Sequence, residues 1–128
     1  MIGLDTNVVV RFLTHDDPPQ TAAALRLMNS LSAESPGFVS LVVIAEIVWV
    51  LKISYAYTKK EIEQVLDGLL RSKELVIERA EIVFQALRKF SDSRTDFADC
   101  LIERCGHAAG CEHTFTFDRN GAGMRLLG

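Results

Sequence analysis

Four carboxylates spread along the chain are the residues best suited to chemistry. Asp5 and Asp118 each follow directly on a short apolar run with the pattern of a strand. Glu46 lies in the middle of an apolar helix, and Asp99 lies in the first turn of a later helix, three residues after Asp96. A carboxylate in apolar surroundings is costly unless it is paired or binds a cation. All four acids therefore need partners.

The chemistry expected of such acids is metal-dependent hydrolysis. If the strands are parallel, Asp5 and Asp118 emerge at the same edge of the sheet, where ligands bind in open α/β sheets. Carboxylates brought together repel one another, so a cation stabilises the cluster. Oxygen ligands suit Mg²⁺ or Mn²⁺ better than zinc. The pattern predicts phosphodiester hydrolysis by metal-activated water, but it does not identify the substrate.

Each acid also has a structural interpretation that needs no metal. Asp5 would then be only the N-cap of a helix, and Glu46 would form a salt bridge with an arginine. Asp96 and Asp99 fall on the same side of their helix as Glu103, so the three would form a solvated acidic face. The recurrence of acids at four places favours the metal site.

Strands and helices alternate along the chain, which predicts an α/β fold with a parallel sheet. Ser40 and Thr58 precede two of the helices as N-caps, and Thr58 with Glu61 has the spacing of a capping box. The helix after Ser40 is apolar on almost every side, so we expect it to be buried on most faces. The expected strands are Met1–Leu4, Phe38–Val39, Glu74–Glu78 and His113–Phe117, and the expected helices are Thr6–Leu13, Pro19–Leu31, Leu41–Tyr55, Thr58–Leu70, Ile82–Phe90 and Asp96–Ala109.

The composition bounds the classes of function. The 128 residues predict a single domain, residues 1–128, and 48% of them are hydrophobic. A net charge of −3 excludes a protein that coats nucleic acid by bulk charge, so any such contact must be local. We expect a cytoplasmic protein without a membrane span, because no signal peptide pattern is visible and the longest apolar run is short. Cys100, Cys105 and Cys111 are expected to be reduced thiols.

The acidic segments, taken in order, resemble those of a known family. Asp5-Thr6-Asn7, Glu46 in its apolar helix, Asp96-Phe97-Ala98-Asp99-Cys100-Leu101-Ile102 and Thr116-Phe117-Asp118-Arg119 resemble the PIN-domain nucleases, in particular the VapC type of bacterial toxin. The resemblance implies a PIN-like three-layer sandwich, with a central, mostly parallel sheet flanked by helices. It also implies a homodimer that cleaves RNA with Mg²⁺, and a cognate VapB-like antitoxin whose tail enters the acidic site.

The same resemblance assigns roles to individual residues. Asp5, Glu46, Asp99 and Asp118 match the catalytic, metal-binding acids of the family, while Thr6 and Asp96 match supporting positions. The chain departs from the family pattern at Cys100 and at Glu103-Arg104-Cys105, where small apolar residues are more usual. It also ends soon after Asp118, which leaves little room for a full final strand.

Three arginines lie near the acids in sequence and are candidates for binding RNA phosphates: Arg11, Arg94 and Arg119. No stretch interleaves aromatic and basic residues as single-strand platforms do, so we expect recognition by shape and backbone. Tyr55 and Tyr57, with the helices after Pro19 and Thr58, are candidate dimer surfaces.

Several other functions are compatible with parts of the sequence. The fold would also suit a protein that processes RNA outside a toxin-antitoxin pair, or a catalytically idle binding partner. An aspartyl-phosphate phosphatase would place a second acid two residues after Asp5, where this chain has Asn7. A zinc module would draw on Cys105, His107, Cys111 and His113, but the spacing of Cys105 and His107 on a helix points them to different sides.

Overall fold

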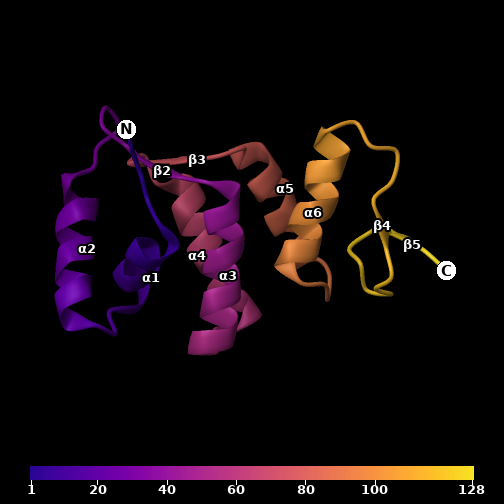
Figure 1. Cartoon of the computed structure of the whole chain (residues 1–128), viewed down its shortest axis with the longest axis horizontal. Helices are drawn as coiled ribbons and strands as arrows, with labels where there is room; N and C mark the ends of the chain where they lie inside the picture. The colour runs from indigo at the N-terminus through magenta and orange to yellow at the C-terminus, as the bar shows by residue number, and fades with distance from the viewer. The chain divides into compact units, whose positions relative to one another are not determined.

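The computed structural model describes all 128 residues and contains two compact units, Met1–Glu78 and Arg79–Gly128. Each unit has its own helices and its own strand pairing (Figure 1). Helices alternate with strands, and every strand pair is parallel, so the predicted α/β class is confirmed. No helix has both the length and the apolar character needed to cross a membrane.

A three-stranded sheet organises the first unit. Its strands are β1 (Ile2–Gly3), β2 (Gly37–Val39) and β3 (Leu75–Ile77), in the order β1-β2-β3. Gly37 lies opposite Ile2 on one side and opposite Leu75 on the other. A Cβ atom at Gly37 would come within 2.8 Å of Leu4 Cδ1, so the residue must be small for this close approach.

The first strand is less buried than the sequence pattern indicates. Leu4 is buried, but Ile2 is 45% exposed and Gly3 is also exposed. A short apolar run at this place predicts a buried strand, and that prediction is wrong for these two residues. The reason is that β1 is an edge strand of its sheet and pairs only with β2.

Four helices complete the first unit: α1 (Thr6–Thr14), α2 (Pro18–Ser30), α3 (Leu41–Tyr55) and α4 (Lys59–Arg71). The predicted caps are present, since Ser40 Oγ accepts from the Val43 N–H at 3.2 Å and Thr58 forms a complete capping box with Glu61. In this unit α1 packs against both α2 and α3. The core includes Val9, Val39, Ile44, Leu51 and Leu66.

Helix α3 is more exposed than its composition indicates. Ile44, Ile47, Val48 and Leu51 are buried, as expected for the core side of the helix. On another side Val42, Trp49 and Ile53 are 69%, 63% and 60% exposed, so the expectation of burial on most faces is wrong. The apolar composition of α3 thus serves both a core face and an exposed stripe.

The second unit contains α5 (Ala80–Ser91), α6 (Phe97–Ala108) and a pair of short parallel strands, β4 (Phe115–Thr116) and β5 (Arg125–Leu126). Helices α5 and α6 lie side by side (Figure 1). The rings of Phe90 and Phe97 meet edge to face, with centroids 5.9 Å apart. A final strand does form after Asp118, although it has only two residues.

Candidate active site

Asp5 occupies the turn between β1 and α1. It is the N-cap residue of α1 by position, with extended backbone angles, and its main-chain carbonyl accepts from the N–H groups of Val8 and Val9. Its carboxylate makes no capping hydrogen bond, and the residue is exposed. The interpretation of Asp5 as only a helix cap is therefore wrong.

Thr6 and Glu46 join α1 to α3 by a hydrogen bond. The buried Thr6 hydroxyl donates to Glu46 Oε1 over 2.7 Å, across 40 residues of sequence. The Glu46 side chain forms no ion pair within its unit, so the salt bridge considered for it is absent. Thr6 thus fixes one oxygen of an otherwise exposed carboxylate and leaves the other oxygen for a ligand.

The second strand-end acid of the first unit has a contrasting, structural role. Glu78 follows β3, and its Oε1 accepts from the Leu41 N–H at 2.8 Å, at the first turn of α3. This carboxylate satisfies a backbone donor that the helix leaves unpaired. A position at the end of a strand therefore does not by itself identify a metal ligand. Asp5 differs from Glu78 because its carboxylate makes no capping hydrogen bond and stays available for a metal.

The second unit holds Asp96, Asp99 and Asp118. Asp96 is the N-cap residue of α6, Asp99 lies in its first turn, and Asp118 follows β4. Burial raises the pKa of Asp99, and the neighbouring Asp118 and Asp96 carboxylates raise this pKa further. These carboxylates interact unfavourably when ionised, and a bound cation would relieve that repulsion.

Local hydrogen bonds hold Asp118 in a defined turn. Its Oδ1 accepts from the Asn120 N–H at 2.9 Å, and its own N–H donates to Thr116 Oγ1 at 3.0 Å. The carboxylate is therefore oriented by the backbone after β4. Glu103 behaves differently from these acids, because it is bonded to Lys89 and Arg104. The alternative in which it forms a solvated acidic face with Asp96 and Asp99 is therefore wrong.

The candidate acids of each unit are ligands of the kind that hard divalent cations prefer. Asp5, Glu46, Asp99 and Asp118 offer only carboxylate oxygens, which suit Mg²⁺ or Mn²⁺. Neither unit by itself brings three His, Cys, Asp or Glu side chains close enough to hold a metal ion. This finding also contradicts a zinc site made of Cys105, His107, Cys111 and His113, all of which belong to the second unit.

The three candidate arginines differ in their surroundings. Arg11 donates to Gln20, Asp16 and Tyr55, so its guanidinium joins α1 to α2 and α3. Its hydrogen bonds give it a structural role, and they also occupy the Tyr55 hydroxyl. Arg94 and Arg119 are exposed, and each lies within two residues of an acid, Asp96 or Asp118.

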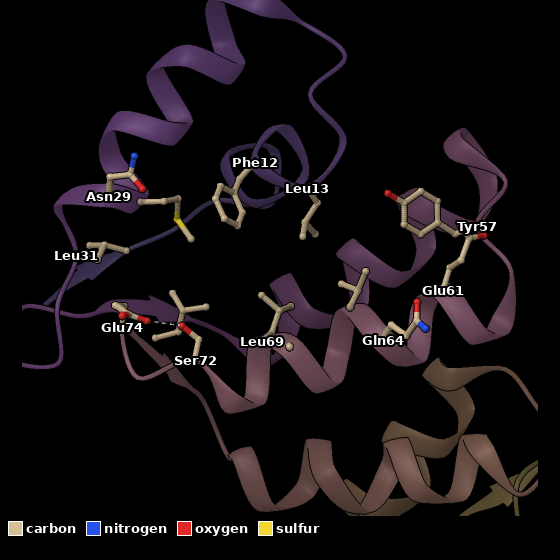
Figure 2. A pocket seen from close by; sticks show the side chains of 14 residues that line it. Phe12, Leu13, Asn29, Leu31, Tyr57, Glu61, Gln64, Leu69, Ser72 and Glu74 are labelled. Atoms are coloured by element: carbon tan, nitrogen blue, oxygen red, sulfur yellow. Dashed lines mark hydrogen bonds between the residues drawn. The ribbon is translucent and has the colours of Figure 1, made fainter.

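A groove of about 770 Å³ in the first unit is a separate feature (Figure 2). Phe12 and Leu13 of α1 face Leu69 of α4 across it, and Glu61 and Glu74 also line it. None of the candidate metal-binding acids lines this groove. With an apolar lining and acidic groups, it is unsuited to binding phosphate.

Thr6 was expected to support the acids, but the sequence did not identify Glu46 as the acceptor of its hydroxyl. The network of Glu103 with Lys89 and Arg104 was not predicted. The sequence does indicate that Glu103 could pair with cations, because α5 and α6 are adjacent amphipathic helices that each carry basic residues. The pairing itself could not be predicted, because the sequence does not give the register between the two helices.

Comparisons with known proteins place these observations in context. The PIN domain family model matches residues 2–124. A protein of Aquifex aeolicus (strain VF5) named VapC ribonuclease is 25% identical over 117 residues, which cover 91% of this chain and 86% of that protein. The crystal structure of Mycobacterium tuberculosis VapC20, described as a Sarcin-Ricin loop cleaving toxin, aligns with 94% of this chain and 91% of its own, at 17% identity and a TM-score of 0.47.

Proposed function

Because the chain belongs to the PIN domain family, we propose that it is a metal-dependent endoribonuclease and the toxin of a VapC-type toxin-antitoxin pair. The observation that carries the proposal is a set of acids left without structural partners: the Asp5 carboxylate makes no capping hydrogen bond, and Thr6 holds one oxygen of Glu46. Burial raises the pKa of Asp99, and the nearby carboxylates of Asp118 and Asp96 raise it further, which is consistent with this arrangement. Such an arrangement is favourable when a cation is bound. The similarity to a protein named VapC ribonuclease, over 91% of this chain, supports RNA as the substrate.

We assign the metal to the four acids that match the family pattern. Asp5, Glu46, Asp99 and Asp118 would hold Mg²⁺, with Mn²⁺ as an alternative, and Asp96 would support Asp99. When bound, the metal would lower the pKa of a coordinated water and stabilise charge on the phosphate. The free carboxylate of Asp5 and the available oxygen of Glu46 support this assignment.

Other residues of the chain would position these groups. The Thr6 hydroxyl orients the Glu46 carboxylate, and the Asn120 N–H orients Asp118. Arg94 and Arg119, exposed beside the acids of the second unit, would bind phosphates of the RNA. Recognition would therefore combine backbone contacts with the shape of the RNA.

The proposal includes partners. The antitoxin would be a VapB-like protein whose tail enters the acidic site, and the nuclease would be a cytoplasmic homodimer. Co-expression with the neighbouring open reading frame tests this part: we expect a stable complex that no longer cleaves RNA. Cleavage that the neighbouring protein does not inhibit would favour a role in RNA processing outside a toxin-antitoxin pair.

The decisive experiment is RNA cleavage by the purified protein. A pool of structured RNAs is incubated with Mg²⁺ or Mn²⁺, and EDTA and an Asp99→Asn variant serve as controls. We expect cleavage that EDTA abolishes and that the variant lowers by more than about 100-fold, because loss of even an indirect metal partner costs 10- to 100-fold. Absence of both cleavage and calorimetric metal binding would refute the proposal.

A further inference from the structure

A basic surface lies on the second unit, outside the candidate metal site. It is formed by Phe84, Arg88 and Lys89 of α5 and by Arg104 of α6, and is called here the α5–α6 basic surface. These side chains line a shallow hollow of about 540 Å³, together with Glu81 and Gln85. Glu103 lies at its edge and is bonded to two of its cations.

One carboxylate holds two of the cations side by side. Glu103 Oε1 accepts from Lys89 Nζ at 2.6 Å and from Arg104 Nε at 2.7 Å, and its Oε2 accepts from Arg104 Nη2 at 3.0 Å. These partners lower the pKa of Glu103 to about 2, so it is ionised at neutral pH. A single negative charge cannot neutralise both cations, and the surface stays positive.

Arg88 adds a third cation beside an exposed aromatic ring. Its guanidinium carbon lies 5.8 Å from the centroid of the Phe84 ring, and Phe84 is 50% exposed. The nearby Glu81 adds little negative charge, because it is bonded to Arg79 at 2.8 Å. An arginine on an aromatic face offers both a phosphate ligand and a stacking surface for a base.

The surface also reaches the loop that follows Asp118. A Cβ atom built on Gly123 would lie 2.9 Å from Lys89 Nζ, so the ammonium group touches this loop. Lys89, Gly123 and Asp118 all belong to the second unit. Positive charge therefore continues from α5 towards the loop that carries a proposed catalytic acid.

We propose that the α5–α6 basic surface binds the phosphate backbone of the RNA substrate, next to the segment that is cleaved. This inference rests on the proposed nuclease function and adds contacts beyond Arg94 and Arg119. A chain with a net charge of −3 repels RNA over long distances, so local cations must hold the strand. Phosphates then bind Arg88, Lys89 and Arg104, and Phe84 stacks against an unpaired base.

A purely structural role for these cations makes a different prediction. Lys89 joins α5 to α6 through Glu103, and Arg104 holds the Glu103 carboxylate from the same helix, so the loss of either cation would alter folding as well as binding. Arg88 separates the two roles, because it is exposed and lies outside the Glu103 network. The test is therefore made at Arg88, with Arg26 of α2 as the matched exposed arginine in the other unit.

The experiment compares Arg88→Glu and Arg26→Glu with the wild-type chain. Affinity for a fluorescein-labelled RNA hairpin is measured by anisotropy in EDTA, over a series of salt concentrations, and thermal melting confirms that each variant is folded. We expect Arg88→Glu to bind about tenfold more weakly and to reduce the slope of log affinity against log salt by about one. Arg26→Glu should bind within about twofold of the wild type.

Cleavage kinetics with Mg²⁺ complete the test. Arg88→Glu should raise KM with little change in kcat, and Arg88→Lys should recover most of the affinity, since both effects follow from a lost phosphate contact. Phe84→Ala should weaken binding to a single-stranded RNA more than to a fully paired one.

The outcomes separate this inference from the proposed function. If the wild type neither binds nor cleaves RNA, the nuclease proposal fails and this inference fails with it. If the wild type cleaves RNA and Arg88→Glu binds as tightly as the wild type, only this inference fails. A change in sedimentation without any change in RNA affinity would identify the surface as a protein interface and overturn the inference.

Discussion

Thr6 is the clearest case of a residue that acts through another side chain. Its hydroxyl, donated to Glu46 over 2.7 Å, is expected to hold this carboxylate in place for a metal. We expect Thr6→Val to lower Mg²⁺ affinity and cleavage about 10- to 100-fold, with a loss of stability of about 1 kcal/mol or less. Calorimetric metal titration and thermal unfolding measure the two effects separately.

The matched variant at this position is Thr6→Ser, which keeps the hydroxyl and removes only a methyl group. It should retain most of the metal affinity. A loss in Thr6→Ser together with no loss in Thr6→Val would show that the methyl packing of Thr6, and not its hydrogen bond, is what matters.

Asp99 links the proposed site to stability. Its pKa is raised above the usual value of 3.8, first by burial and then by Asp118 and Asp96. A carboxyl group whose pKa is raised in the folded state does not lower the stability of the fold while it is protonated at low pH. It lowers that stability as pH rises through the raised pKa and the group ionises. Asp99→Asn should therefore raise the melting temperature at pH 7 without metal, but not at pH 3.

Added Mg²⁺ gives the complementary measurement for the same variant. It should raise the melting temperature of the wild type by binding the folded state, and it should have little effect on Asp99→Asn. A variant that is less stable than the wild type at neutral pH without metal would contradict this reading of Asp99.

The acids could be predicted from the sequence because strand ends and apolar helices mark them locally. Asp5 and Asp118 each end an apolar run, and Glu46 interrupts one. Their contacts could not be predicted, because they depend on register between elements. The bond from Thr6 to Glu46 spans 40 residues, and Glu103 falls on the same helical face as Asp99 yet pairs with Lys89 of α5.

The packing of α5 against α6 combines an apolar interface with the Glu103 network. Lys89, Glu103 and Arg104 have side chains that are 30%, 15% and 23% exposed, so their charges are only partly screened. We expect Glu103→Gln to destabilise the fold by about 1 to 3 kcal/mol at pH 7, because it loses charge-assisted hydrogen bonds. Chemical denaturation of the two proteins measures this difference.

The contribution of Glu103 to stability changes with pH in a direction that follows from its lowered pKa. The pKa of Glu103 is lowered from 4.5 to about 2, so its stabilising effect is complete above pH 4.5 and is lost as pH falls towards 2. The difference in free energy of unfolding between the wild type and Glu103→Gln should therefore disappear as pH falls from 4.5 to about 2. Glu81→Gln is the control, because the bond of Glu81 to Arg79 is at the surface and should contribute little.

The helices could be predicted more fully than the exposure of their faces. Ser40 and Thr58 cap α3 and α4 as their types indicate. Helix α3 nevertheless exposes an apolar stripe, and β1 is an edge strand, although both have compositions typical of buried elements. Composition reports how apolar an element is, but the neighbours that cover it are determined by the arrangement of all the elements.

The exposed stripe of α3 bears on the state of the molecule in solution. Val42, Trp49 and Ile53 are all more than half exposed and are spaced so that they share one helix face. Apolar side chains that gather on a surface favour association with a partner. Together with the homodimer proposed above, the stripe leads us to expect that two copies of the chain meet through Trp49 and Ile53 in the second half of α3, beyond the proposed metal ligand Glu46.

Trp49 itself reports on this association, because it is the only tryptophan in the chain. We expect its fluorescence emission to move to shorter wavelength as protein concentration rises, in step with dimer formation in sedimentation velocity, because burial removes water from the indole. Ile53→Glu should abolish both changes by placing a charge in the stripe. Ile102→Glu makes the same change at an exposed isoleucine of α6 and should leave both intact. A wild type that stays monomeric at every concentration, or equal disruption by the two variants, would exclude α3 as the dimer surface.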